Sequence, residues 1–163
     1  MAIELGPIRE ILKKALQVEL DGHTFYTMAA ERAEQPAVRD LFERLARDEV
    51  EHKTYLRNVM RRLEELGADS FFMEPKDPDL AEYSSEIFGD EFRKQALGVT
   101  TAQSALSIGM QLEENAVAFF TAAADASKDP QAKGFFRFLA DWEGQHYRIL
   151  ERLLKLVQSD AVN

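Results

Sequence analysis

Apolar residues recur at every third or fourth position through four long segments of the chain, and polar residues fill the positions between them. This spacing is that of one face of an α-helix, and no segment alternates as a half-buried strand does. Pro7 suits a first helical turn, and Asp129 before Pro130 suits a helix N-cap. The pattern predicts helices over about residues 7–35, 36–66, 101–127 and 130–159.

The spacing between these segments predicts how the helices are connected. The joints within the first pair and within the second pair are short, so each pair should form an antiparallel hairpin. Residues 67–100 separate the hairpins, with a short helix expected between Asp79 and Phe88. A crossover of this length lets the second hairpin begin at either end of the first. We therefore predict a single all-α domain over 1–163, a ferritin-like four-helix bundle with one long crossover.

The two hairpins repeat each other at a constant offset of 94 residues, as Phe42 and Phe136 illustrate. Polar residues within the apolar stripes obey the same offset. The matching pairs are Glu19 with Glu113, Glu49 with Glu143, and His52 with His146. Duplication explains the match, but it does not explain why Glu and His occupy positions that packing would give to Leu.

Each half of the chain thus carries a Glu followed, 30 residues later, by Glu-x-x-His. Residues three apart on a helix differ by about 60° in direction, so this Glu and this His can contact one ion. Two helices giving one Glu each and two giving Glu-x-x-His form the carboxylate-bridged dinuclear set. Four carboxylates also balance two divalent cations. The predicted metal ligands are Glu19, Glu49, His52, Glu113, Glu143 and His146.

An oxygen-rich set with one imidazole per ion suits Fe(II) or Mn(II) better than copper, and a structural zinc site needs neither two ions nor six ligands. We favour two Fe ions as the cofactor, because bridging carboxylates can stay bound through an Fe(II)/Fe(III) cycle. Manganese, or a mixed Fe/Mn pair, stays open. No catalytic residue is predicted beyond the ligands themselves.

Two further residues lie on the first predicted helix beside the ligand Glu19. Tyr26 follows it by two turns and could donate its hydroxyl to a ligating carboxylate of the opposite half, or be an ordinary core aromatic. Its repeat partner is Phe120, so any such bond exists on one side only. His23 follows Glu19 by one turn, and we expect a flanking or surface histidine there.

Residues directly beside a ligand are turned away from it by about 100° on a helix. Trp142 is therefore expected to point off the apolar stripe and to serve in packing. Asp48 is expected either to be solvated or to lie directly behind the ligands, and not to bind the metal itself.

Composition narrows the classes of function. The formal net charge is −9, which disfavours nucleic acid and anionic lipid as partners. The absence of Cys excludes disulfides and thiolate metal sites. No apolar run approaches the roughly 18 residues of a membrane span, and the first residues do not form a secretory signal, so we expect a cytoplasmic protein with no membrane partner.

The ligand pattern resembles the ferritin-like superfamily, and specifically its rubrerythrin branch. The matching residues are Glu19 through Tyr26, Glu49-Val50-Glu51-His52, Glu113 and Glu143-Gly144-Gln145-His146. The resemblance implies that Glu19 and Glu113 are terminal ligands, that Glu49 and Glu143 bridge both metals, and that each histidine caps one metal. It also implies reduction of hydrogen peroxide by oxidation of a di-iron(II) centre.

Two departures from the rubrerythrin pattern matter. Rubrerythrin itself has a rubredoxin domain with four Cys, whereas this sequence has none, so it resembles the di-iron domain only. An external electron donor such as a rubredoxin or a flavin reductase is then expected. Ala116 stands where rubrerythrin has an extra carboxylate, which makes the six-ligand set more similar to that of bacterioferritin. We also expect a homo-oligomer, with a dimer as the first expectation.

Three hypotheses follow. The first is a di-iron oxidoreductase of peroxidase or ferroxidase type that couples Fe(II) oxidation to the reduction of hydrogen peroxide or dioxygen. The second is a non-catalytic protein that binds, stores or delivers iron. The third is a metal-free structural bundle.

Overall fold

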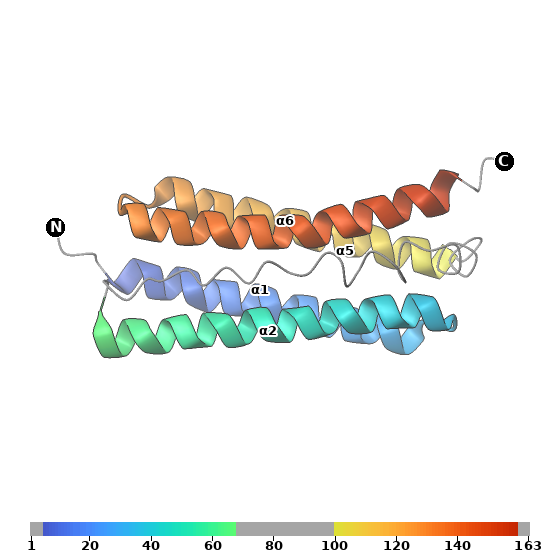
Figure 1. The fold of residues 1–163 in the computed structure, drawn as a ribbon, viewed down its shortest axis with the longest axis horizontal. Coiled ribbons are helices and arrows are strands. Elements are labelled where there is room, and N and C mark those ends of the chain that lie inside the picture. Colours follow the sequence, from blue (N-terminus) through green and yellow to red (C-terminus); the bar gives the residue numbers. More distant parts are fainter. Residues whose placement is uncertain (1–4, 68–99, 160–163) are drawn as a thin grey trace.

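A computed structural model describes residues 5–67 and 100–159, which form four long helices and no strand (Figure 1). The all-α prediction is therefore confirmed over these residues. The helices are α1 (Leu5–Arg32), α2 (Pro36–Leu66), α5 (Thr100–Ala126) and α6 (Pro130–Ser159).

The helix ends follow from local chemistry. Helix α1 ends at Arg32, three residues before the predicted end, because the residue before a proline is disfavoured in the helical region. Gln35 is accordingly extended, with φ −83° and ψ 127°, ahead of Pro36. At the start of α6 the predicted N-cap is confirmed, since Asp129 Oδ1 accepts a hydrogen bond of 2.8 Å from the backbone N–H of Ala132.

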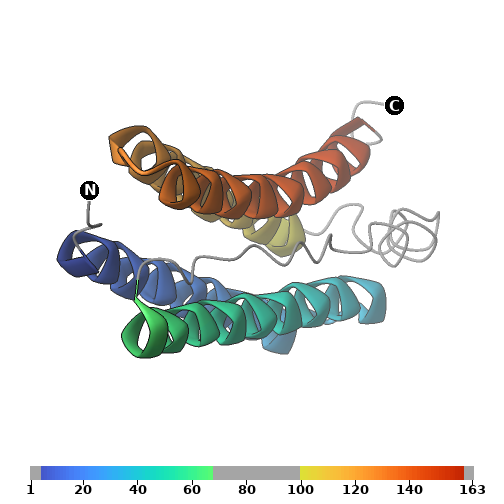
Figure 2. The same ribbon diagram turned by 60° about the vertical axis from the view of Figure 1, so that its left-hand side comes forward.

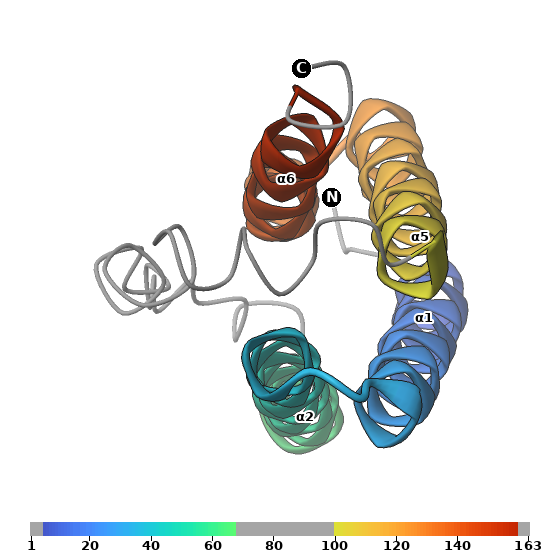
Figure 3. The same ribbon diagram turned by 90° about the vertical axis from the view of Figure 1, so that its right-hand side faces the viewer.

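The arrangement of the helices is that of a ferritin-like four-helix bundle. Helices α1 and α2 form one antiparallel hairpin and α5 and α6 the other, and the two hairpins lie as two layers (Figure 2). Seen along the bundle, α1 lies beside α5 (Figure 3). Helix α2 ends at the opposite end of the bundle from the start of α5 (Figure 1). The crossover 67–100 and the short helix expected within it lie outside the described residues, apart from Gly67 and Thr100.

The core consists of two apolar clusters at opposite sides of a polar layer. The first cluster gathers around Leu41, Phe42 and Leu45 of α2 with Leu150 and Leu153 of α6. The second cluster is richer in aromatic rings. It includes Leu12, Leu56, Leu63, Phe120, Phe135, Phe136 and Leu139. Apolar burial of this extent is the main stabilising contribution to a helical bundle.

The four described helices are amphipathic along their length. None of them combines the length and the apolar character that a membrane span requires.

Candidate metal centre

Six Glu and His side chains are buried in the part of the chain that the structure describes, and they are the six that the sequence predicts as ligands. Each exposes 3 % or less of its surface. They are Glu19 of α1, Glu49 and His52 of α2, Glu113 of α5, and Glu143 and His146 of α6. All four helices therefore contribute to one polar layer between the two apolar clusters.

His52 faces carboxylates from two other helices. Its Nδ1 lies 3.2 Å from Oε2 of Glu19 and 3.2 Å from Oε1 of Glu143. Oε2 of Glu49, on the same helix, lies 3.8 Å from the same nitrogen. The spacing of three residues thus brings Glu49 and His52 to the same point, as the Glu-x-x-His pattern predicts.

His146 has an equivalent environment on the other side. Its Nδ1 lies 3.2 Å from Oε1 of Glu49 and 3.3 Å from Oε1 of Glu113. The two oxygens of Glu49 therefore face the two histidines separately, which is the disposition that a bridging carboxylate needs. Potential ligand atoms of Glu49, His52, Glu143 and His146 all lie within 4.8 Å of one another.

The carboxylates of this layer are difficult to ionise together. Burial, followed by the charge of Glu19, raises the pKa of Glu49 well above its ordinary value. Burial also raises the pKa of Glu113, although the nearby His146 partly counteracts this rise. Without metal the cluster therefore retains protons on some of its acids.

The pKa values of the two histidines are raised, although burial alone would lower them. Burial alone would lower the pKa of His52, but the Glu143 and Glu19 carboxylates outweigh it and raise this pKa well above its ordinary value. The pKa of His146 is also raised well above its ordinary value, because the charge of Glu113 and the hydrogen bond to Asp48 outweigh the effect of burial. Protonated histidines thus stand in for cations in the metal-free cluster.

Three buried polar atoms in this layer form no well-oriented hydrogen bond among the described residues, although two of them have an oppositely charged neighbour within 3.3 Å. They are Oε1 of Glu19, Oε1 of Glu143 and Nδ1 of His146. Buried polar atoms without such a bond are destabilising, and each of these three belongs to a residue that faces the centre of the cluster. Cations bound in this layer would coordinate these atoms. The donor set, oxygen-rich with one imidazole per position, fits a pair of Fe or Mn ions.

Tyr26 is not a ligand candidate but donates a hydrogen bond to one, as its position two turns after Glu19 allows. Its buried hydroxyl donates a hydrogen bond to Oε1 of Glu113, a carboxylate of the opposite half. Its repeat partner Phe120 is buried and has no hydroxyl to donate. His23, in contrast, is half-buried, and its Nδ1 lies 3.0 Å from the backbone oxygen of Ala46, so it takes no place among the six.

Two neighbours of the ligands contact the histidines from behind, and this agrees with one of the two alternatives expected for Asp48. Oδ2 of Asp48 lies 3.1 Å from Nε2 of His146. The expectation that Trp142 serves in packing is confirmed, since it belongs to the second apolar cluster. The expectation that it points away from the site is wrong, because its indole stacks on the ring of His52 with 3.8 Å between centroids. The sequence does contain a sign of this difference, since Asp48 and Trp142 occupy matching positions of the two halves and are different residue types.

A cavity of about 210 Å³ opens beside the cluster between α1 and α5. Its wall includes the carboxylate-bearing residues Glu49, Glu113 and Glu143, together with Gly22 and Ala116. A Cβ at Gly22 would lie only 3.1 Å from Cδ of Glu49, so glycine leaves this carboxylate room to move. Ala116 lines the wall where rubrerythrin has an extra carboxylate.

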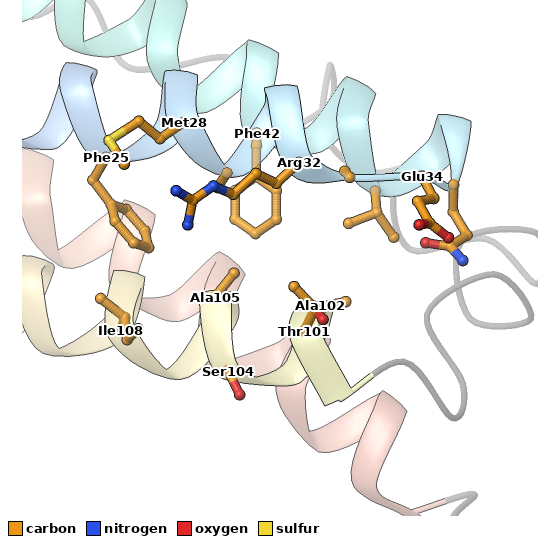
Figure 4. A pocket seen from close by; sticks show the side chains of 14 residues that line it. Phe25, Met28, Arg32, Glu34, Phe42, Thr101, Ala102, Ser104, Ala105 and Ile108 are labelled. Carbon is orange, nitrogen blue, oxygen red and sulfur yellow. The ribbon is translucent and has the colours of Figure 1, made fainter.

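A larger cavity of about 290 Å³ lies elsewhere, between α1, the α1–α2 turn and the start of α5 (Figure 4). Phe25, Met28 and Phe42 meet Ala105 and Ile108 across it. None of the six buried ligand candidates lines it.

Comparison with known proteins agrees with this geometry. Searches of the curated proteins and of the solved structures found no significant match. A scan against protein-family models matches the rubrerythrin family over residues 10–154, which include α2, α5, most of α1 and α6, and all six buried Glu and His residues. The chain belongs to the rubrerythrin family.

Proposed function

We propose that this protein is a non-haem di-iron oxidoreductase, which couples Fe(II) oxidation to the reduction of hydrogen peroxide or dioxygen. The observation that carries the proposal is the layer of six buried Glu and His residues, with polar atoms at its centre that lack a well-oriented hydrogen bond, next to an open cavity. When bound, two ferrous ions supply two electrons, so that hydrogen peroxide and two protons yield two water molecules.

The ligand residues hold the ions and balance their charge. Glu19 and Glu113 approach one histidine each and are suited to terminal ligation. Glu49 lies between the two histidines, and Glu143 approaches His52 from the opposite hairpin. Carboxylates in these places keep two ions close together and tolerate a change of charge on them.

The size of the cavity between α1 and α5 agrees with a small oxidant. Its volume of about 210 Å³ admits molecules of the size of hydrogen peroxide or dioxygen, and three acidic ligand candidates lie in its wall. The small residues Gly22 and Ala116 keep this wall open.

Tyr26 holds a proton beside the site. Burial, followed by the charges of Glu113 and Glu49, raises the pKa of its hydroxyl well above the ordinary value. The hydroxyl therefore stays protonated and keeps the Glu113 carboxylate oriented through its hydrogen bond. Electrons for re-reduction come, in this proposal, from a separate donor such as a rubredoxin or a flavin reductase, and the protein acts as a cytoplasmic homodimer.

Rapid mixing tests the proposed reaction. The protein is loaded anaerobically with two Fe(II) per chain, and absorbance of ferric iron is followed after mixing with hydrogen peroxide and, separately, with dioxygen. We expect oxidation of both ions by at least one oxidant, faster than for free Fe(II) in the same buffer. Binding of two Fe(II) without accelerated oxidation by either oxidant would contradict the redox function and favour an iron-binding or iron-delivery role.

A further inference from the structure

The six ligand candidates divide into two pairs of the same composition. We call Glu19 with His52 position A, since Nδ1 and Oε2 lie 3.2 Å apart, and Glu113 with His146 position B, since Nδ1 and Oε1 lie 3.3 Å apart. Any difference between two ions bound here therefore arises from the residues around the ligands.

The first difference concerns a hydroxyl. At position B, Tyr26 donates a hydrogen bond to Glu113, whereas the matching residue beside position A is Phe120. The backbone beside Tyr26 also differs between the two halves. A Cβ at Gly109 would lie 3.1 Å from Cδ1 of Leu150, 3.3 Å from Cε1 of Tyr26 and 3.4 Å from its hydroxyl, and the repeat partner of Gly109 is Ala15. Glycine at this position thus leaves room for Leu150 and for the Tyr26 side chain.

The second difference concerns the histidines. At position B, Nε2 of His146 lies 3.1 Å from the Asp48 carboxylate. A carboxylate here accepts a hydrogen bond from the Nε2–H group, which leaves Nδ1 as the ligating atom and makes it more basic. At position A the residue matching Asp48 is Trp142, which covers His52 with a stacked ring at an interplanar angle of 22°. An indole face offers no acceptor of that strength.

Both polar partners therefore lie at position B, and the matching residues at position A, Phe120 and Trp142, replace neither of them. We propose that the two metal positions are inequivalent: position B binds its ion first and more tightly, and position A takes its ion last and releases it first. The inference rests on the metal binding within the proposed function, and not on its redox step. Partners of this kind change metal affinity by about 10–100-fold.

Titration with Co(II) under anaerobic conditions tests the order of binding without requiring iron chemistry. Calorimetry measures the two affinities, and the visible Co(II) absorption reports the ligand environment at each step. We expect two steps with dissociation constants that differ at least about tenfold. Two identical steps would overturn the inference while leaving the metal centre itself intact. Absence of Co(II) binding would overturn both.

The double variant Tyr26→Phe, Asp48→Asn removes both polar partners of position B with little change in volume. We expect it to weaken the first step by about 10–100-fold, to change the Co(II) spectrum of that step, and to leave the second step in place. Weakening of the second step alone would contradict the assignment.

A mirror variant covers the case in which the double variant does not fold. Ala15→Gly with Phe120→Tyr places a hydroxyl near Glu19, in the environment that Gly109 and Tyr26 have at position B. We expect the second step to strengthen and the first to keep its affinity. No strengthening, in a variant whose helix content by circular dichroism is unchanged, would count against the proposal.

Discussion

The polar layer in the middle of the bundle and the apolar clusters on either side of it use the same helices for opposite purposes. The clusters bury Leu and Phe side chains at 0–2 % exposure and stabilise the fold under any condition. The polar layer buries six ionisable groups and leaves three polar atoms without a well-oriented hydrogen bond. Its contribution to stability therefore depends on bound cations and on pH, whereas that of the clusters depends on neither.

The largest expected effect comes from removing the two central carboxylates. In the natural protein, free metal at 100 times its Kd adds about 2.7 kcal/mol per site, so two ions should raise Tm by roughly 10–20 °C. The variant Glu49→Gln, Glu143→Gln should lose most of this rise, measured by calorimetry with and without Fe(II) under anaerobic conditions.

The matched control is Glu51→Gln, Glu114→Gln, which makes the same change of charge at two exposed positions beside the ligands. It should keep the full rise in Tm. An equal loss in both double variants would show that the rise depends on net charge and not on the polar layer.

Truncation within the clusters should have the next largest effect. Leu63→Ala in the second cluster and Leu153→Ala in the first each remove a fully buried side chain, and each should lower the free energy of unfolding by about 2–5 kcal/mol. Denaturant unfolding measures this loss. The metal-dependent rise in Tm should persist in both variants, and its disappearance would contradict the separation of the two regions.

The metal-free protein should lose stability as pH rises. The pKa values of His52 and His146 are raised on folding, so their contribution is complete below the ordinary His pKa of about 6.5 and is lost as pH rises through the folded values. The raised pKa values of Glu49 and Glu113 act in the same direction from about pH 4.5 upward.

Thermal unfolding between pH 6 and 9 measures this dependence. In the presence of EDTA, Tm should fall with rising pH by several degrees, and less so in Glu49→Gln, Glu143→Gln. With saturating metal, the rise in Tm that the metal produces should grow with pH, since metal competes with protons for the same atoms. A metal-free Tm that increases over this range would contradict the assigned charge states.

The smallest effect on stability should come from the N-cap of α6, which takes no part in the polar layer. Asp129→Ala removes the N-cap hydrogen bond of α6 and should lower stability by about 1 kcal/mol. The repeat partner of Asp129 is Gln35, whose side chain makes no cap hydrogen bond, so Gln35→Asp should stabilise α2 by a similar amount. Neither variant should change metal binding, which the same calorimetric titration verifies.

Much of this architecture could be predicted from the sequence, because the buried face of a helix shows in the sequence as apolar residues at every third or fourth position. The starts of α2 and α6 at Pro36 and Pro130 were predicted correctly. The early end of α1 was missed because apolar spacing continues past Arg32, while the proline that forbids helix lies four residues later.

The candidate site was predicted less completely. Six polar residues on apolar stripes identify the polar layer, because packing alone would not place them there. For the partners behind them, the sequence left two alternatives open for Asp48 and missed the contact of Trp142 with His52, because the direction of both side chains depends on which opposite helix they meet. Periodicity along one helix does not carry that information. A comparison of the two halves at these positions would have shown that the surroundings differ.

Iron retained per chain tests the central claim most directly. The natural protein and the variant Glu49→Gln, Glu143→Gln are loaded anaerobically with excess Fe(II), desalted, and analysed for iron by mass spectrometry against protein concentration. The predicted result is two iron ions per chain of the natural protein and close to none in the variant. An iron content well below two in the natural protein, or equal contents in both proteins, would contradict a di-iron centre built from the six buried Glu and His residues.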